Sequence, residues 1–414
     1  MLRSTLHAVR GLAPELRTLF ITTLLFRSGT MAFPFLSAYL VARNDFSAGQ
    51  VGGIIGAYGV GALAADIAAG PLLRFVSART VMISGLLGNA ALVAILPFAE
   101  SAALLTVGTL VWGFFYEAFT PAAYAETVRY SKESDRKVAF SCNRLAINIG
   151  MGIGPALGGL VFAWRPAGLF LINACVVLAT AVLLTLRTSK GAVAAEGKLV
   201  RGRLVAPTLK DETRFWTIFL LALPIHLAYA LPPTFLSAYV IHERGLGSFW
   251  TGIIFFVNAA AIVLFEVPLN TAMRNVSHFA SLLVGYLLAG SGFALMGLSG
   301  SGAALVGATL LWTAAEMIVF PALLHYVSDV SDPSVTARNM GLYSAGVNVG
   351  LIAVPQLSLM LTAGGQASTP WYVVGASVGV ALVLIVTVRR SSYFWLPNPE
   401  AEPSSTTVTE TRRV

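Results

Sequence analysis

The chain has 414 residues, of which 56% are hydrophobic and only 11% are charged, and its formal net charge is +8. Soluble domains carry about 25% charged residues, so this composition excludes an ordinary soluble globular protein. A positive net charge can indicate nucleic-acid binding, but the placement of the basic residues, described below, points to membrane topology instead.

Apolar segments of membrane-spanning length follow one another along the whole chain. A spanning helix needs about 20 predominantly apolar residues. The hydrophobic pattern predicts twelve such helices, at residues 17–40, 48–72, 79–98, 101–124, 138–164, 166–187, 214–240, 248–272, 277–298, 301–324, 336–362 and 369–389. Some connections are so short that the third and fourth, fifth and sixth, and ninth and tenth helices must be antiparallel neighbours.

Polar segments divide the chain into parts. We expect a cytoplasmic N-terminal segment, a six-helix bundle, a linker, a second six-helix bundle and a tail, at residues 1–16, 17–187, 188–213, 214–389 and 390–414. The linker is polar and basic and is predicted to be a plain cytoplasmic tether. The tail is rich in Ser, Thr, Glu and Pro, so we expect it to be disordered. The predicted fold class is an all-α membrane protein of two six-helix bundles.

The basic residues predict the orientation in the membrane. With the N-terminus in the cytoplasm, 22 of the 27 Lys and Arg residues fall on cytoplasmic segments, and the outer loops hold only Arg43, Arg165 and Arg244. Arg27 and Arg144 lie within predicted helices. This positive-inside pattern predicts a multi-pass protein of the cell (inner) membrane with both termini cytoplasmic. The first helix has no signal-peptide pattern and is expected to be an uncleaved anchor.

The two bundles repeat each other at a spacing of 200 residues. The run Phe-Leu-Ser-Ala-Tyr occupies residues 35–39 and again residues 235–239. The repeat includes eight further residues that return 200 positions later: Thr109, Leu110, Trp112, Pro121, Ala122, Asn148, Gly150 and Pro155. In the second and eighth helices the spacing changes from 199 to 200 residues, so Asp66 and Glu266 are candidate equivalents only if this shift precedes them. Parallel repeats of this kind predict a moving seam between two like-oriented halves.

The fifth predicted helix carries a glycine motif. Its residues are Gly150, Gly154, Pro155, Gly158 and Gly159. Small residues four apart let helix backbones approach closely, and the proline removes a backbone donor. This segment resembles the Gly-x-x-x-Gly-Pro-x-x-Gly-Gly signature of antiporters of the major facilitator superfamily, and it matches at every fixed position. The resemblance extends over nearly the whole chain, excluding the termini and the middle linker.

Two other motifs of that superfamily are altered. The loop after the second helix runs from Gly70 to Arg79, and Arg74 stands where the family has an aspartate that helps to latch the cytoplasmic gate. In the fourth helix, Thr109 stands four residues before Gly113, where proton antiporters often carry an arginine. The resemblance implies that helices 1, 4, 7 and 10 line a cavity, that helices 2, 5, 8 and 11 form the seam, and that the others face lipid. The two halves would rock about a midplane site.

All four implied cavity helices carry one ionisable residue at mid-depth: Arg27, Glu117, His226 and Glu316. A charge at this depth costs at least about 2.5–3.5 kcal/mol, so each is a candidate substrate-binding or proton-binding residue. We expect Arg27 and Glu117 to form or exchange an ion pair. Glu316 has no cation in its own half except His226, which favours it as the proton carrier. The alternative for His226 is a structural role, in which its side chain is merely hydrogen-bonded within a polar wall of the cavity.

The implied seam helices carry a second group of charges. Asp66, Arg144 and Glu266 lie in the cytoplasmic third of helices 2, 5 and 8. With Arg74 they form the predicted gating set, whose members pair in one state and separate in another. Simple exposure of these side chains to water is the alternative.

Several kinds of chemistry have no support in this sequence. Cys142 and Cys175 lie in apolar helices and indicate neither a disulfide framework nor a metal site. Glu126 and His325 lie near cytoplasmic helix ends and are expected to be solvated. No phosphate-binding loop, nucleotide-binding domain or catalytic cluster is evident, so we predict no enzyme, no cofactor and no metal site.

Three functional hypotheses follow. The first is a proton-coupled antiporter, monomeric, that exports small amphipathic organic molecules such as drugs, secondary metabolites or siderophores. The second is an uptake symporter or facilitator for a small anionic metabolite or nutrient, which Arg27 would bind. The third is a membrane receptor or assembly factor that moves no cargo. The partners expected for the first are a small molecule, protons and lipid, without nucleic acid.

Overall fold

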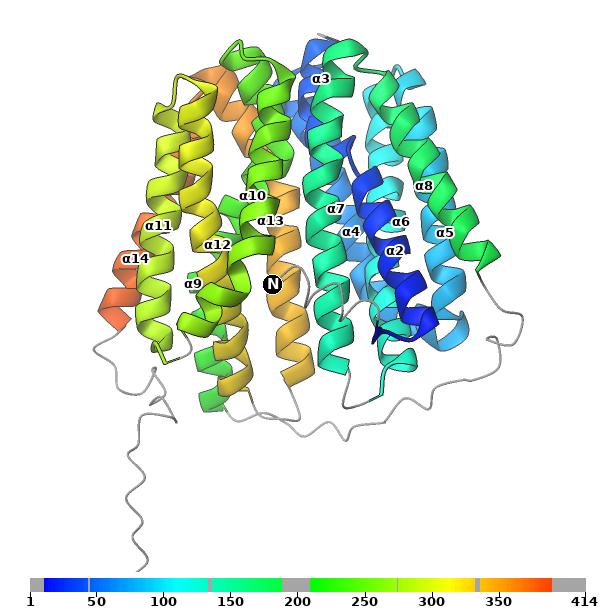
Figure 1. Ribbon diagram of the computed structural model, residues 1–414. Coiled ribbons are helices and arrows are strands. Elements are labelled where there is room, and N and C mark those ends of the chain that lie inside the picture. Colours follow the sequence, from blue (N-terminus) through cyan, green and yellow to red (C-terminus); the bar gives the residue numbers. More distant parts are fainter. Residues whose placement is uncertain are drawn as a thin grey trace, which may run out of the picture.

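A computed structural model describes residues 11–43, 45–132, 136–187, 209–273, 275–331 and 336–388. Within these ranges the chain is helical apart from short turns (Figure 1). Twelve spans in the described residues are long and apolar enough to cross a membrane, which confirms the predicted number. Most of the predicted linker, at 188–208, and the predicted disordered tail lie outside the described residues.

Each half of the chain contributes six spans. The first half forms α2 (Pro14–Gly29), η1 (Phe33–Phe35), α3 (Leu36–Ala42), α4 (Ala48–Phe75), α5 (Ala78–Ile95), η2 (Leu96–Phe98), α6 (Ala102–Tyr130), α7 (Arg136–Trp164) and α8 (Gly168–Leu186). The second half forms α9 (Leu209–Ala238), η4 (Tyr239–Glu243), α10 (Ser248–Ala272), α11 (His278–Leu298), α12 (Gly302–Val330), α13 (Thr336–Gly364) and α14 (Thr369–Val388). The first span combines α2, η1 and α3. Helices such as α9 begin before the predicted positions because they continue past the apolar core.

Serine residues mark where five of the helices begin. The side-chain oxygen of each accepts a hydrogen bond from the backbone N–H three residues later, in the set Ser47, Ser77, Ser101, Ser277 and Ser301. An N-cap satisfies one of the free N–H groups at the start of a helix. At α4 the cap is reciprocal, because the Gln50 side chain accepts from the Ser47 N–H at 2.9 Å.

The helices are arranged as two bundles that meet along a seam. The contacts between the halves come mainly from α4 with α13 and from α7 with α10. Helices α11 and α14 lie at one edge of the molecule, and α5 and α8 lie at the other (Figure 1). We call the end at which α2 begins and α14 ends the inner end, in keeping with the predicted topology, and the opposite end the outer end.

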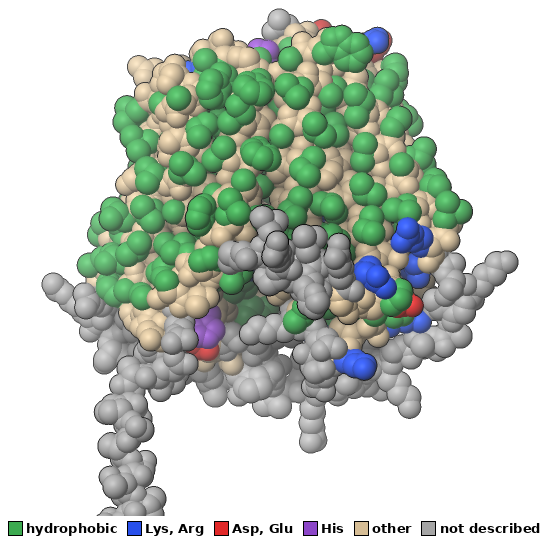
Figure 2. Space-filling view, viewed as in Figure 1, with side chains coloured by type: hydrophobic (Ala, Val, Ile, Leu, Met, Phe, Trp, Pro, Cys, Tyr) green, Lys and Arg blue, Asp and Glu red, His purple; other side chains and the backbone are tan. Residues whose placement is uncertain are grey.

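The surface carries an apolar belt. Hydrophobic side chains cover most of the height of the viewed face, and Lys and Arg side chains gather near its inner end (Figure 2). Ile67, Leu160 and Val383 are among the large apolar residues more than half exposed. A soluble protein rarely exposes apolar patches of this extent, so lipid is the solvent of this face.

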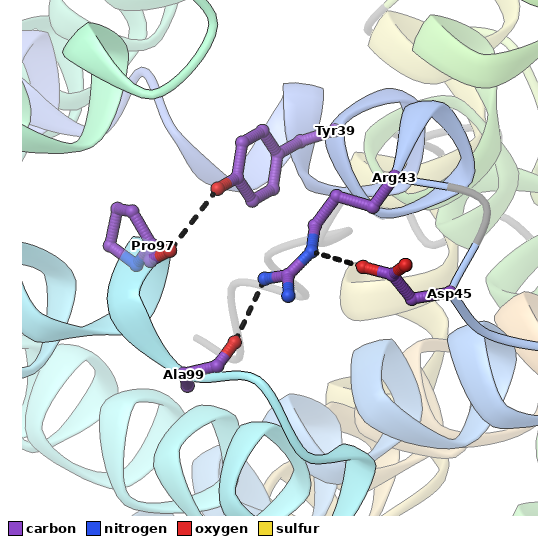
Figure 3. A network of polar contacts seen from close by, with 5 residues as sticks. All are labelled: Tyr39, Arg43, Asp45, Pro97 and Ala99. Carbon is purple, nitrogen blue, oxygen red and sulfur yellow. Dashed lines mark hydrogen bonds and ion pairs between the residues drawn. The ribbon is translucent and has the colours of Figure 1, made fainter.

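Matching hydrogen bonds fasten the outer end of each bundle. In the first half, the Tyr39 hydroxyl donates to the Pro97 carbonyl at 3.5 Å, and Arg43 donates to the Ala99 carbonyl at 2.8 Å and to Asp45 at 3.1 Å (Figure 3). The second half repeats this pattern with its own residues: Tyr239 donates to Met296 at 2.9 Å, and Arg244 to Gly297 at 2.6 Å. Arg43 and Arg244 therefore tie the first span of each bundle to the third.

Candidate functional site

The first span is broken at mid-membrane, directly after Arg27. Helix α2 ends at Gly29, and Pro34 in η1 cannot donate a backbone hydrogen bond. The N–H groups of Met31 and Ala32 both donate to the Asn173 side-chain oxygen, each at 3.1 Å, and that of Met31 also donates to the Gly29 carbonyl at 2.8 Å. Because an unpaired backbone group is costly in a membrane, Asn173 of α8 stabilises the break.

Arg27 points from α2 toward α6. Its side chain is 6% exposed and donates to the hydroxyls of Tyr116 and Thr120, the latter at 2.7 Å. The guanidinium carbon also lies 4.7 Å from the centre of the Tyr116 ring and 5.3 Å from that of Phe26. Hydroxyls and aromatic faces together offset the cost of burying this charge.

Glu117 does not pair directly with Arg27. Among the described residues no ion pair within 4.0 Å joins these two side chains. Instead, the Thr120 hydroxyl bridges them, since it accepts from Arg27 and also hydrogen-bonds the Glu117 carboxylate. The expected pair is thus present only through Thr120, because Arg27 lies over the helix face of Tyr116 and Thr120, one turn apart, and Glu117 projects beside that face.

Glu316, in the C-terminal half, has no cation beside its carboxylate among the described residues. Its carboxylate accepts a hydrogen bond at 2.9 Å from Asn258 of α10, which also lies 3.0 Å from the Thr313 hydroxyl. In the described part of the chain no Lys, Arg or His lies within 4.0 Å of it. The two halves therefore differ: a bridged Arg–Glu pair in one and an unpaired carboxyl group in the other.

His226 is buried away from Glu316. Only 1% of the residue is exposed, and neither ring nitrogen has a hydrogen-bond partner among the described residues. Its ring stacks on Phe320, with centres 6.1 Å apart, and meets Tyr343 edge-on at 4.8 Å. Phe320 lies one turn inward from Glu316 along α12, so His226 sits about one turn deeper than the carboxyl group.

Two polar contacts cross the seam in its inner third. Asn348 of α13 donates to Asp66 of α4 at 2.8 Å, and Arg144 of α7 forms an ion pair with Glu266 of α10. Asp66 and Glu266 lie at the same depth, each 18 residues from the first residue of its helix, Ala48 or Ser248. The two acids occupy equivalent depths but accept hydrogen bonds from different groups, Asp66 from an amide and Glu266 from a guanidinium.

Arg74 and Glu126, two further charged residues near the inner end, have different surroundings. Arg74 is exposed at the end of α4 and forms no ion pair with another described residue. Glu126 differs from the expectation of a solvated side chain, because it is 6% exposed and lies 3.7 Å from Arg129 on the next turn. It faces the interior of the first bundle, where Arg129 supplies a compensating charge.

The glycine motif of α7 faces two different helices. A methyl group added at Gly150 would lie 2.8 Å from the Leu24 carbonyl oxygen, and one at Gly154 would lie 2.9 Å from that of Ser28, both on α2. A methyl group at Gly159 would lie 2.8 Å from the Ser248 carbonyl oxygen, across the seam on α10. The motif therefore packs the first span within its own bundle and also closes the seam.

The outer half of the seam is closed by short contacts. Ser37 and Ser237, equivalent residues in the repeat, are buried with their hydroxyl oxygens 2.9 Å apart. His242 donates to the Ala38 carbonyl at 2.9 Å, and Ser248 donates to the Gly159 carbonyl at 2.8 Å. Two of these outer contacts reach a backbone carbonyl of the other half, whereas both inner contacts join side chains, Asn348 with Asp66 and Arg144 with Glu266. The conformation is therefore closed at its outer end.

A charge exchange tests the Arg144–Glu266 contact. The variants Arg144→Glu and Glu266→Arg each place like charges together at the seam, and we expect each to lower transport in vesicles. The double exchange restores an attractive pair and should recover much of the loss. The matched control is Arg74→Glu on exposed α4, which should have little effect. If the double variant transports no better than the single variants, the contact has no role in the transport cycle.

Two like-oriented helical bundles, with ionisable side chains on the helices between them, define a two-lobed membrane transporter. Residues 18–343 match the family described as the Major Facilitator Superfamily, and the chain belongs to it. It is accordingly a secondary transporter and not an enzyme.

Relatives and solved structures agree with this assignment. The chain is 22% identical over 374 residues to the uncharacterized MFS-type transporter YqjV of Bacillus subtilis (strain 168), covering 88% of this chain and 90% of that protein. It is 23% identical to YhjO of the same organism, described in the same words, over 76% of this chain and 78% of that one.

Among solved structures, a POT family transporter in complex with 5-aminolevulinic acid superposes with a TM-score of 0.75 at 15% identity, covering 90% of this chain and 95% of that one. The nucleoside transporter NupG superposes with a TM-score of 0.76 at 13% identity, over 91% and 100% of the two chains. At these identities the likeness establishes the shared fold.

Proposed function

We propose that this protein is a proton-coupled antiporter that exports small amphipathic organic molecules. The observation that carries the proposal is the environment of Glu316, a buried carboxyl group that accepts from Asn258 and has no cation beside it among the described residues. Burying a negative charge without a partner costs free energy, and binding a proton removes that cost. Glu316 is therefore suited to take up and release a proton at mid-membrane.

The surroundings of the candidate site support an amphipathic cargo. Aromatic rings surround the polar groups in the second half, where Tyr229 contacts Trp312 and Phe320 with ring centres 5.9 and 5.1 Å apart. In the first half, Arg27 lies against aromatic faces. A ligand with an apolar body and a few polar groups would suit such a lining.

Export would follow from competition at this site. A proton entering from the outer side would neutralise Glu316, release the cargo and permit the return of the empty site. A cargo molecule entering from the inner side would displace the proton. In this cycle Asp66, Arg144 and Glu266 would act as gating residues and separate as the halves rock. The working location is the cell (inner) membrane, with both termini cytoplasmic and a monomer as the functional unit.

Arg27 supports a second candidate function, uptake of a small anion. Its guanidinium is buried and is bridged to Glu117 through Thr120 rather than fully neutralised by direct contact. A substrate carboxylate could displace this bridge and pair with Arg27. The two functions make different demands on Arg27, because an amphipathic neutral cargo does not need its charge.

Flux through proteoliposomes tests both functions. A thermal-shift panel of neutral amphiphiles, including chloramphenicol, and of small carboxylates, including succinate, selects a ligand for radiolabelled flux with and without a pH gradient. We expect a neutral amphiphile to be transported against its gradient when the cargo-receiving side is acidic, and Arg27→Ala to retain binding of it. Transport of carboxylates only, lost in Arg27→Ala, would favour uptake of anions. Amphiphile flux that ignores the pH gradient would contradict proton coupling.

A further inference from the structure

Two histidines and an aspartate meet at the inner end of the second bundle. His278 is the first residue of α11, and His325 and Asp329 lie one turn apart near the end of α12. One ligand atom from each of the three lies within 4.8 Å of the others. His278 Nε2 lies 3.1 Å from the Asp329 carboxylate, and His325 Nδ1 lies 3.7 Å from it. None of these residues belongs to the candidate transport site.

From this geometry we propose that His278, His325 and Asp329 bind a borderline divalent metal ion, with Zn²⁺ as the representative ligand. Two imidazoles and one carboxylate form a donor set that suits zinc and its neighbours rather than magnesium or calcium. Zinc holds nitrogen and oxygen ligands at about 2.0–2.2 Å, so two ligand atoms at the tetrahedral angle stand about 3.3 Å apart. The His278–Asp329 and His325–Asp329 separations, 3.1 and 3.7 Å, lie within a few tenths of an ångström of this spacing. The remaining His278–His325 separation, within 4.8 Å, would have to shorten toward this spacing when the ion binds.

Neighbouring side chains hold the two imidazole rings in place. The rings lie 4.9 Å apart between centres. The Tyr326 ring packs edge-on against His278 with centres 5.6 Å apart and fixes its orientation. The Arg214 guanidinium of α9 interacts electrostatically with Tyr326, so one positive charge lies near the proposed metal site.

The site is open to solvent on one side. The His325 side chain is 69% exposed, while that of His278 is 19% exposed and that of Asp329 33% exposed. In Figure 2 a histidine and an acidic side chain lie together at the inner edge of the second bundle. Three protein ligands with an exposed fourth position admit water or another small ligand. A bound ion would join the inner ends of α11 and α12, so this part of the second bundle would move as one unit.

Calorimetric titration of ZnCl₂ into the purified full-length chain tests the proposal. The protein carries an affinity tag without histidines and is treated with chelator first. We expect one Zn²⁺ to bind per chain, with a rise in the thermal unfolding midpoint that only the metal-loaded protein shows. Co²⁺ in place of Zn²⁺ should produce visible absorption bands of a four-coordinate ion.

Three variants and a control give the test its specificity. His278→Ala, His325→Ala and Asp329→Asn should each lose binding by tenfold or more. His242→Ala, which alters a histidine at the outer end, should bind as the wild type does. Absence of Zn²⁺ binding by the wild type, or unchanged binding in both His278→Ala and His325→Ala, would overturn the proposal. Neither result bears on Glu316, because the titration requires no transport.

Discussion

Glu316→Gln is expected to abolish export driven by a pH gradient while preserving exchange of cargo between the two sides. Glutamine has nearly the same shape and can still accept the Asn258 hydrogen bond that Glu316 accepts at 2.9 Å. It cannot take up or release a proton, so the cycle loses its coupling step. Cargo counterflow needs only alternate exposure of the loaded site, which a permanently neutral side chain permits.

Two flux measurements on the same proteoliposomes check this expectation. Gradient-driven flux of the selected amphiphile should fall to the level of protein-free liposomes, and counterflow with no pH gradient should remain. Glu243→Gln, an exposed residue at the outer end, is the matched control and should leave both fluxes unchanged. Gradient-driven flux that survives in Glu316→Gln would refute the assignment. If Glu117→Gln alone abolishes that flux, the proton site lies in the first half.

The architecture could be predicted because it depends on long apolar runs and on the repeat. Twelve runs of membrane length leave only a helical bundle, since each backbone polar group must be satisfied inside its own helix. The repeat also explains a contact near the pseudo-twofold axis, although it was not predicted. Ser37 and Ser237 stand at equal positions in the two halves, and they meet across the seam at 2.9 Å. Equivalent residues near such an axis meet each other.

The side-chain partners could not be predicted from depth alone. Arg27 and Glu117 lie at similar depth, yet the guanidinium reaches Thr120 first because a helix turns 100° per residue. The sequence also places His226 and Glu316 at the same depth in the membrane. His226 instead packs against Phe320, one turn away from Glu316, since helices counted from opposite ends of the membrane accumulate errors of about a turn.

Asn173 shows what sequence reasoning overlooked. It caps the broken first span through two hydrogen bonds of 3.1 Å, to N–H groups four and five residues after Arg27. The available signal was a single amide in an otherwise apolar helix, since such a side chain needs a partner in the membrane. Its partner could not be inferred, because the break in the first span depends on how Pro34 and Gly29 are accommodated in three dimensions.

The glycines of α7 lead to a second prediction with a large effect, in which two similar substitutions have different consequences. Gly159→Ala would place a methyl group 2.8 Å from the Ser248 carbonyl oxygen, a contact between the halves that would separate if the outer end opened. Gly150→Ala would instead crowd the first bundle internally, because its methyl group would lie 2.5 Å from Arg27 Cβ and within 3 Å of Leu24 and Ser28. Overpacking costs about 1–3 kcal/mol, and each 1.4 kcal/mol shifts a population by about tenfold.

We expect Gly159→Ala to favour the outward-open state and Gly150→Ala to lower overall thermal stability. The shift toward the outward-open state is measured with a reporter thiol at the outer seam. The reporter is Ser37→Cys, introduced after both native cysteines have been replaced by Cys142→Ser and Cys175→Ser. The hydroxyl it replaces is buried in the closed state, so a membrane-impermeant maleimide applied to whole cells should label it slowly. Gly159→Ala should raise the labelling rate severalfold with little change in melting temperature.

The control is Gly108→Ala, because a methyl group there meets nothing within 4 Å. It should change neither the labelling rate nor the melting temperature. Equal effects of Gly159→Ala and Gly150→Ala on both measurements would mean that the motif only packs helices. If each variant has only its own expected effect, the motif has two functions. Gly150 and Gly154 hold the Arg27 segment of α2 in place, and Gly159 allows the two bundles to touch. Because glycines of a single helix, α7, would serve both tasks, the motif would couple the position of the buried charge to closure of the outer gate.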